Sequence, residues 1–278
     1  MRIDGHAHAS GDFLNGENII RILDENEVDY VILAGSAQLE SKKNEDLSLF
    51  SNLSQRYPFN FIYIINTIIR IVNTLNHTSK RLDLGNQHVY DLVRQYPNRM
   101  IQFYWVNPKD NNVIEKLNDA YIKYHYKGLK LHQCITNFDI KSESMREIVK
   151  WAEEKDMPVF VHLCSKKDVI AMVDFIKNHE NVNFIIAHLI GLELFIDCLP
   201  KQPNVFFDIS CYQIVSEAKI KLAIERFGHE RIVMGSDTPY GEENLKEIIS
   251  LVNKLNLTDS DKEMILGGNL QKILKIDS

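Results

Sequence analysis

Short apolar segments alternate with longer amphipathic segments along most of the chain. The run from 28 to 34 is continuously apolar, which is typical of a parallel strand buried on both faces. The other runs are similarly short and are bounded by turn-forming residues. Together they predict eight strands, at residues 2–6, 28–34, 100–106, 127–132, 158–162, 182–187, 205–208 and 231–235.

Segments with helical periodicity follow most of these strands. Ser144 with Glu147, and Ser165 with Asp168, have the spacing of a capping box at a helix start. The glycines at 267–268 predict a helix end followed by a short tail. Five helices are predicted with both bounds, at residues 112–124, 144–155, 217–227, 244–255 and 259–266. Three more are predicted to begin near residues 15, 165 and 192, and another is predicted to end near residue 97.

Strand–helix alternation of this length predicts an α/β protein with a parallel sheet. Eight repeats favour closure into a (β/α)8 TIM barrel over an open doubly wound sheet. A chain of 278 residues suits one such barrel, so residues 1–278 are expected to form a single domain. No Gly-x-Gly-x-x-Gly motif follows a strand, which lowers the case for a dinucleotide-binding domain.

Residues 36–86 depart from this alternation, between the second and third predicted strands. The stretch 59–75 is rich in Ile and Phe and fits either one amphipathic helix or a strand followed by a helix. Asn66, Arg70 and Asn73 make it too polar to span a bilayer. We expect an insertion here that acts as a lid over the core fold.

Composition narrows the class of partner. The net charge of −6 argues against general binding to nucleic acid or to acidic membranes. The four cysteines lack metal-finger spacing, and the N-terminus lacks the pattern of a secretory signal. We therefore expect a cytoplasmic protein with reduced thiols that acts on a small molecule, with no membrane partner.

Ionisable residues stand where the apolar strands end. His6 and His8 lie two apart on the first strand, so both imidazoles face one point. His162, His188 and Asp237 end the fifth, sixth and eighth strands. In barrels, catalytic groups gather at these carboxyl ends. Burying such groups is costly unless they share a partner, and a divalent metal is a suitable common partner.

These pieces resemble the amidohydrolase superfamily, and within it the amidohydrolase-related (amidohydrolase 2) group. The matching motifs are Ile3-Asp4-Gly5-His6-Ala7-His8, Lys127-Gly128-Leu129-Lys130-Leu131-His132, Val159-Phe160-Val161-His162, Ile186-Ala187-His188 and Gly235-Ser236-Asp237-Thr238-Pro239. The resemblance covers nearly the whole chain outside residues 36–86.

The resemblance implies a role for each motif. His6, His8, His162 and Asp237 correspond to metal ligands, and Asp237 also to the group that takes a proton from water. His188 corresponds to the residue that polarises the substrate carbonyl, or to a ligand of a second metal. Lys130 is compatible with a bridge between two metals. We favour one divalent metal, Zn²⁺ ahead of Mn²⁺, Fe²⁺ or Co²⁺, with Lys130 as a cation beside the metal or substrate.

Other residues could line the site. His132 lies two beyond Lys130 and shares its face, and it fits a site role and a structural role equally. Tyr104 and Trp105 end the third strand, and Tyr212 follows the seventh; each is a candidate for the substrate pocket. Two residues past His162, Cys164 fits a soft metal ligand, although we expect a small buried core residue.

Three functions are compatible with this pattern. The first is a metal-dependent hydrolase, in which metal-activated water attacks the carbonyl carbon of an amide, lactone or ester. The second keeps the site but performs non-oxidative decarboxylation of an aromatic or unsaturated acid. The third is a barrel that binds without catalysis, which the full set of ligand types disfavours. The chain also resembles proteins that form homodimers, and a homodimer is expected.

Overall fold

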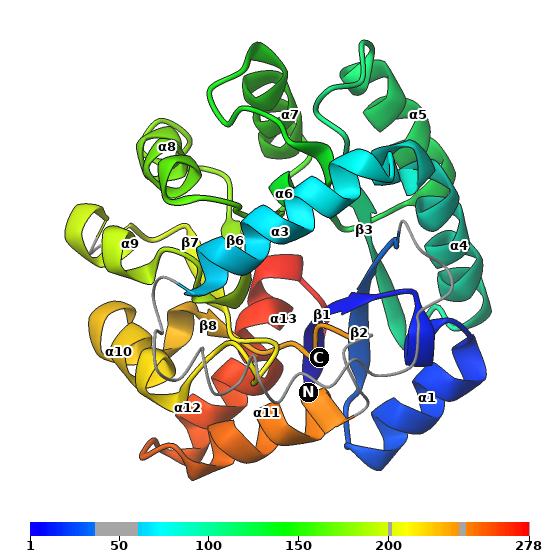
Figure 1. The fold of residues 1–278 in the computed structure, drawn as a ribbon. Helices are drawn as coiled ribbons and strands as arrows, with labels where there is room; N and C mark the ends of the chain where they lie inside the picture. The colour runs from blue at the N-terminus through cyan, green and yellow to red at the C-terminus, as the bar shows by residue number, and fades with distance from the viewer. Residues whose placement is uncertain (37–60, 200–201, 239–242, 278) are drawn as a thin grey trace.

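The computed structural model describes residues 1–36, 61–199, 202–238 and 243–277, and shows an α/β barrel of eight parallel strands (Figure 1). All eight predicted strands are present. Their bounds are β1 (Ile3–His8), β2 (Tyr30–Ala34), β3 (Met100–Trp105), β4 (Gly128–His132), β5 (Val159–His162), β6 (Phe184–Ile186), β7 (Val205–Asp208) and β8 (Ile232–Val233).

Each strand pairs in parallel with the next one in sequence. The barrel closes between the region after β8 and β1: Ala7 forms a parallel bridge with Thr238, and the His8 amide donates to the Thr238 carbonyl over 2.8 Å. Gly235 permits this approach, because a Cβ there would lie 2.7 Å from the His6 Cβ. The predicted (β/α)8 fold is confirmed.

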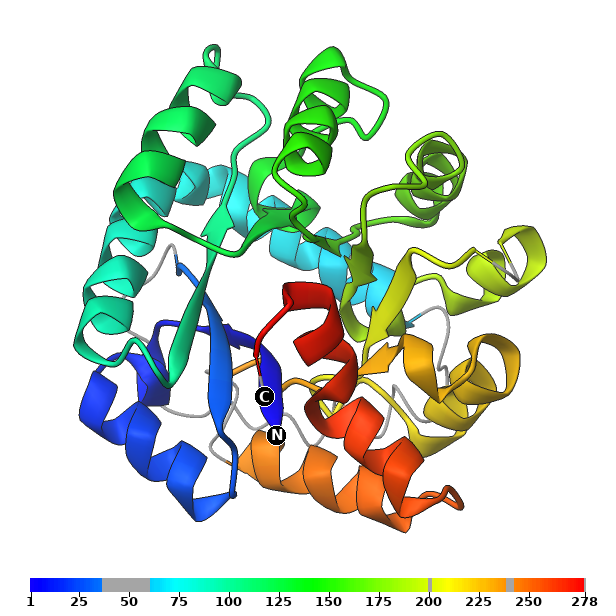
Figure 2. The same cartoon turned by 180° about the vertical axis from the view of Figure 1, so that it is seen from behind.

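Helices surround the strands, as both views show (Figure 1, Figure 2). The bounds of the longer ones are α1 (Gly16–Glu25), α3 (Phe61–Leu75), α4 (Leu82–Gln95), α5 (Val113–Tyr124), α7 (Glu143–Glu154), α8 (Lys166–Ile176), α9 (Leu192–Cys198), α10 (Glu217–Phe227) and α11 (Glu243–Lys254). The shorter ones are α6 (Gln133–Thr136), α12 (Asp259–Glu263) and α13 (Asn269–Leu274). None of the described helices is long and apolar enough to cross a membrane.

The insertion between β2 and β3 contributes α3, which is one helix rather than a strand and a helix. In Figure 1 α3 crosses in front of the strands, and in the reverse view of Figure 2 it lies behind them. Asn66 of α3 donates to the Leu163 carbonyl just after β5, so α3 lies over the carboxyl ends of the strands. Residues 37–60, which carry the rest of the predicted lid, lie outside the described residues.

Two predicted helix boundaries are wrong. The helix α7 begins at Glu143, and Ser142 rather than Ser144 caps it by accepting from the Met145 amide. The predicted tail after Gly267 and Gly268 is instead the helix α13, which is reached through a π-helical turn. This turn requires a glycine at position 267, because it packs against the N-terminal backbone and a Cβ would lie 2.4 Å from the Met1 carbonyl oxygen.

The capping box of Ser165 and Asp168 at the start of α8 is confirmed by both of its hydrogen bonds. Replacing Ser165 by Ala is expected to lower the free energy of unfolding by about 1 kcal/mol, because the Asp168 amide loses its acceptor. Urea unfolding measures this change. Ser144→Ala is the control, since the Ser144 hydroxyl bonds Ser142 and not a helix amide; an equal loss in both variants would contradict the assigned cap.

Candidate metal centre

Two histidines and an aspartate from opposite ends of the chain meet at the carboxyl end of the barrel. His6 and His8 lie on β1, and Asp237 follows β8. The His6 Nε2 is 3.4 Å and the His8 Nε2 3.9 Å from the Asp237 Oδ1. One ligand atom from each residue lies within 4.8 Å of the other two, which is a spacing that one metal ion can bridge. We call these three residues the primary cluster.

The second ring nitrogen of each histidine is held by the protein. The His8 Nδ1 donates to the Gly35 carbonyl over 2.9 Å, which leaves the lone pair on Nε2 facing Asp237. The His6 Nδ1 lies 3.1 Å from the Asp208 Oδ2 and 2.9 Å from the Ser210 hydroxyl. Metal-binding histidines are oriented in this way in proteins, since the outer hydrogen bond fixes the tautomer.

Electrostatics favour a bound cation. Burial, reinforced by the nearby Lys130, lowers the pKa of His8 to about 3 and holds that of His6 below its usual range. Both imidazoles therefore stay neutral; the His8 Nε2 lone pair faces Asp237, and the His6 Nε2 lone pair faces Asp237 and the Lys130 amine. Burial raises the pKa of Asp237 well above its ordinary value despite Lys130. A divalent cation would satisfy the buried carboxylate and both lone pairs, so these residues fit the predicted metal.

His188 lies beside the primary cluster in a fixed orientation. Its Nε2 is 3.6 Å from the Asp237 Oδ2, and its Nδ1 is 3.2 Å from the Ser210 carbonyl. Its amide donates to the Asp208 Oδ2, while its backbone φ of 52° is left-handed. Burial lowers the pKa of His188 to about 4, so the ring is neutral at neutral pH. The held position is suited to exchanging a proton with Asp237.

Asp208 and Ser210 are site residues that the sequence reasoning missed. The Asp208 carboxylate accepts from the Ser210 amide and hydroxyl and from the His188 amide, and it contacts His6. The sequence did contain a signal for Asp208. β7 is an apolar run that ends in an aspartate, as other strands end in their ionisable residues.

Lys130 on β4 is buried and points at the primary cluster. Its Nζ is 2.6 Å from the His6 Nε2 and lies 3.9 Å from the centre of the Phe160 ring. Desolvation lowers the pKa of Lys130 to about 7, even though Asp237 and Asp208 oppose this. The Lys130 amine therefore lies beside the candidate metal ligands, which is the position that the sequence predicted for it.

His162 does not join the primary cluster among the described residues. Its ring centre is 5.0 Å from that of His188, and its Nε2 contacts the Asn66 Oδ1 at 3.1 Å. Its ligand atoms lie close to those of His132 and Cys134 instead. The metal-binding role of His162 thus stays a prediction, and Asn66 of α3 is a partner that the sequence did not indicate.

The remaining candidates separate into inner and outer positions. Trp105 points inward: its ring lies 5.3 Å from that of His8 and stacks at 5.7 Å on that of His132. Tyr104 points the other way and stacks on Tyr126 at 4.9 Å. Tyr212 is 37% exposed. Of these candidates, the structure thus brings Trp105 against His8 of the primary cluster, places His132 behind Trp105, and leaves Tyr104 outside the barrel wall.

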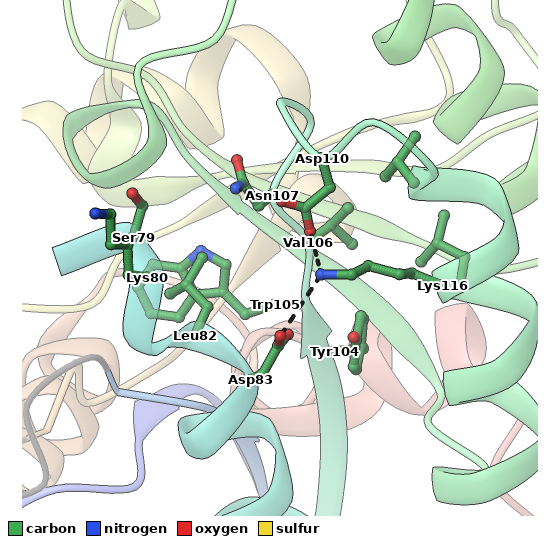
Figure 3. A pocket seen from close by; sticks show the side chains of 12 residues that line it. Ser79, Lys80, Leu82, Asp83, Tyr104, Trp105, Val106, Asn107, Asp110 and Lys116 are labelled. Atoms are coloured by element: carbon green, nitrogen blue, oxygen red, sulfur yellow. Dashed lines mark hydrogen bonds and ion pairs between the residues drawn. The ribbon is translucent and has the colours of Figure 1, made fainter. Parts of the chain in front are cut away.

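A pocket of about 280 Å³ lies beside the end of β3 (Figure 3). Both Tyr104 and Trp105 contribute to its wall. On its far side Lys116 bridges Asp110 at 2.7 Å and Asp83 at 3.5 Å. Trp105 therefore lines this pocket and also contacts His8 of the primary cluster.

The fold and the site define a (β/α)8 barrel with a candidate metal centre at its carboxyl end. The family model described as Amidohydrolase (Amidohydro_2) matches residues 76–276, and the chain belongs to this family. No curated protein matches the chain.

Solved structures share the fold over the full length. A 5-carboxyvanillate decarboxylase from Sphingomonas paucimobilis is 11% identical, with 99% of each chain covered and a TM-score of 0.68. A dihydroxybenzoic acid decarboxylase from Polaromonas with bound manganese and 2-nitroresorcinol is 12% identical, with 100% of this chain and 97% of that chain covered and a TM-score of 0.69. A probable 2-pyrone-4,6-dicarboxylic acid hydrolase from Acinetobacter baumannii is 14% identical, with 99% of each chain covered and a TM-score of 0.66.

Proposed function

We propose that this protein is a metal-dependent decarboxylase of an aromatic or unsaturated acid. The observation that carries the proposal is the convergence of His6, His8 and Asp237 beside a neutral His188. Two of the similar structures are decarboxylases of aromatic acids, and one of them holds manganese. Inward-facing rings of Trp105 and His132 beside this centre suit a planar substrate.

The primary cluster would hold one divalent cation. Imidazole and carboxylate ligands suit Zn²⁺, which we expect first, and also Mn²⁺. When bound, the cation supplies a Lewis acid that polarises a substrate oxygen. Lys130, whose Nζ lies 2.6 Å from the His6 Nε2, adds positive charge or a hydrogen-bond donor beside the primary cluster.

Asp237 and His188 are suited to moving one proton. The Nδ1 of His188 faces the Ser210 carbonyl, so it carries the hydrogen and Nε2 carries the lone pair. That Nε2 faces the Asp237 Oδ2 at 3.6 Å. A proton held on Asp237 or on the His188 Nε2 can be delivered to the substrate carbon as the bond from that carbon to the carboxylate breaks and CO₂ leaves. In the product, a hydrogen atom replaces the carboxyl group of the substrate.

The test is decarboxylation in D₂O. Enzyme loaded with Zn²⁺ or Mn²⁺ is incubated with a panel of hydroxylated aromatic acids, and CO₂ release and product mass are measured. The expected result is release of CO₂ and a product that carries one deuterium at the carbon that lost the carboxylate. Metal-free enzyme is the control. Failure to release CO₂ from any acid, together with turnover of lactones, would overturn the proposal.

A hydrolase is the second candidate. The same Asp237–His188 pair can take a proton from an attacking water molecule, and the similar structure from Acinetobacter is described as a probable 2-pyrone-4,6-dicarboxylic acid hydrolase. In this reaction the pair accepts a proton where the decarboxylase donates one. A parallel screen of lactones, amides and esters, scored by acid release, separates the two candidates.

Trp105 is a candidate for recognising the substrate. Its indole Nε1 is buried and has no hydrogen-bond partner within the described residues, so a ligand oxygen could accept from it. Trp105→Phe keeps an aromatic ring but removes the donor, and is expected to raise KM about 10-fold with little change in kcat. Trp151→Phe is the matched control, because its Nε1 donates to Asn118 away from the site. Equal kinetics in both variants would contradict this role.

An exposed surface of α3 is a candidate for the contact between the subunits of the expected homodimer. α3 carries an exposed apolar stripe at helical spacing, in which Ile64, Ile68 and Ile71 are 59%, 57% and 55% exposed. If this stripe is the dimer contact, Ile68→Glu is expected to convert a dimer to a monomer in sedimentation velocity. Ile122→Glu on α5, where Ile122 is 73% exposed, is the control that should leave the dimer unchanged.

A further inference from the structure

Asn66 is a polar residue on the buried face of the insertion helix α3. The buried positions of α3 are Ile62 and Asn66, one helical turn apart, whereas Ile64 and Ile68 are exposed. Asn66 itself is only 1% exposed. Burying an amide costs free energy unless its polar atoms form hydrogen bonds. Hydrogen bonding, rather than apolar packing, therefore explains an asparagine at this position.

The hydrogen bonds of Asn66 all reach three consecutive residues at the end of β5. Its Nδ2 donates to the Leu163 carbonyl over 3.0 Å, and its Oδ1 lies 3.1 Å from the His162 Nε2. The Cys164 thiol donates to the Asn66 backbone carbonyl over 3.6 Å. One residue of the insertion thus holds the strand end that carries His162.

These hydrogen bonds determine which nitrogen of His162 has a lone pair. Because the Asn66 Nδ2 donates to Leu163, the Oδ1 is the atom that faces His162, and an amide oxygen can only accept. The His162 Nε2 therefore carries the hydrogen. In the neutral imidazole the Nδ1 then keeps its lone pair, which is what a metal ligand must offer.

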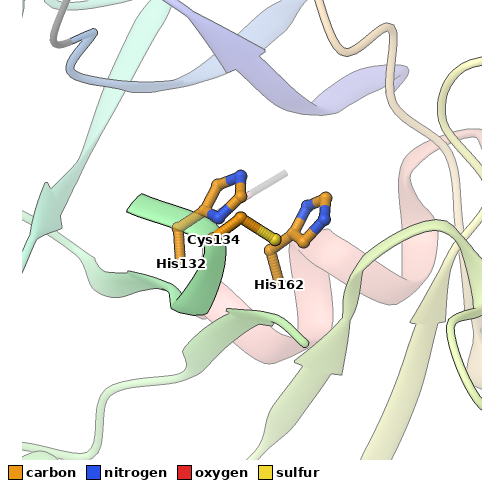
Figure 4. A group of neighbouring side chains, drawn as sticks. All are labelled: His132, Cys134 and His162. Carbon is orange, nitrogen blue, oxygen red and sulfur yellow. The ribbon is translucent and has the colours of Figure 1, made fainter. Parts of the chain in front are cut away.

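A second contact fixes the plane of the His162 ring. His132 is the register partner of His162 on the neighbouring strand, and the two rings are nearly parallel with centres 3.9 Å apart. Figure 4 shows these rings side by side at the ends of β4 and β5, with Cys134 beside them. Stacking on His132 fixes the ring plane, and the hydrogen bond with Asn66 selects one of the two flipped orientations of the ring.

His162 lies one ring away from the primary cluster. Its ring centre is 5.0 Å from that of His188, whose Nε2 is 3.6 Å from the Asp237 Oδ2. We propose that Asn66 is a positioning residue of the metal centre, which holds His162 as the Nε2–H tautomer so that the Nδ1 faces the ion of the primary cluster (the primary ion). This inference rests on the proposed function, because it takes His162 as a further ligand of that same ion.

The proposal makes the insertion between β2 and β3 part of the metal centre. If α3 positions a ligand, then docking of α3 raises the affinity for the ion, and by linkage the ion stabilises the docked helix by the same factor. Loss of a residue that orients a metal-binding histidine typically weakens metal binding 10- to 100-fold. The effect on affinity is therefore large enough to measure without any substrate.

The first test measures Zn²⁺ affinity of full-length variants against a competing chelator. Asn66→Ala is expected to weaken binding by about 10–100-fold. Asn66→Asp keeps an oxygen that accepts from His162 and should bind Zn²⁺ more tightly than Asn66→Ala. Asn204→Ala is the matched control: Asn204 is also buried, and its Nδ2 donates to the His179 and Val182 carbonyls at the amino end of β7. This control should lose stability but keep the wild-type affinity.

A second measurement needs no variant of Asn66. Nitrogen-15 NMR of labelled histidine rings is expected to show His162 as the Nε2–H tautomer in the metal-free wild-type protein, with Zn²⁺ shifting its Nδ1 resonance. The spectrum of His162→Gln identifies the two signals. A structural role for Asn66 alone would give no reason for a shift at this nitrogen.

Wild-type Zn²⁺ affinity in Asn66→Ala would overturn the proposal, as would an affinity loss that Asn204→Ala shares. A His162 ring that binds Zn²⁺ through Nε2, or whose Nδ1 does not respond to Zn²⁺, would overturn it as well. Neither measurement involves turnover. Failure of the decarboxylation assay in D₂O would therefore count against the proposed function and leave the positioning role of Asn66 to these two tests.

Discussion

Replacement of Asp237 by Asn is expected to lower kcat by about 10²–10⁴-fold, the range for loss of a general acid or base. The carboxylate faces His6 and His8 on one oxygen and His188 on the other. The amide keeps the shape but cannot carry the transferred proton. It also binds a cation more weakly. Steady-state kinetics at saturating metal, with metal content measured on the same sample, separates these two effects.

Asp174→Asn is the matched control for this change, because Asp174 is an exposed carboxylate on α8 that pairs loosely with the exposed Lys141 and Lys177. Its kinetics should equal those of the wild type. Asp208→Asn gives an intermediate case. It leaves Asp237 in place but weakens the hydrogen bonds that hold His6 and His188, so a loss of about 10–100-fold is expected. An Asp237→Asn enzyme with wild-type kcat would contradict the proposed proton transfer.

The strands of the barrel could be predicted because burial on both faces leaves a continuous apolar run, as in β2 and β5. The convergence of His6, His8 and Asp237 followed from the barrel, since parallel strands bring their carboxyl ends to one rim. These predictions need only strand order and side-chain alternation. They do not depend on the detailed packing of any side chain.

The partners of these residues could not be predicted in the same way. The contact of Asn66 with His162 depends on how α3 crosses the barrel, and an isolated helical pattern does not give that angle. Tyr104 and Trp105 are adjacent, so one must face inward and the other outward, and the pattern alone did not decide which. The grouping of His162 with Cys134 depends on side-chain rotamers, which sequence spacing does not specify.

His6 has more partners in the site than His8, and this difference leads to a contrast between two variants. The His6 ring contacts Asp208, Ser210, Asp237 and Lys130, whereas the His8 ring is held by the Gly35 carbonyl. Both His6→Ala and His8→Ala should lose the primary ion and most activity. Only His6→Ala leaves the buried Asp208 and Lys130 groups short of a partner.

His6→Ala is therefore expected to lower the free energy of unfolding of the metal-free protein by about 1–3 kcal/mol more than His8→Ala does. Urea unfolding in the presence of a chelator measures this difference, and metal analysis of reloaded protein measures ion content. His125→Ala, at an exposed position after α5, should change neither quantity. Because a metal site needs both imidazoles, retention of the primary ion in either variant would show that His6 and His8 do not share one cation. The stability difference would then have to come from the buried hydrogen bonds of His6 alone.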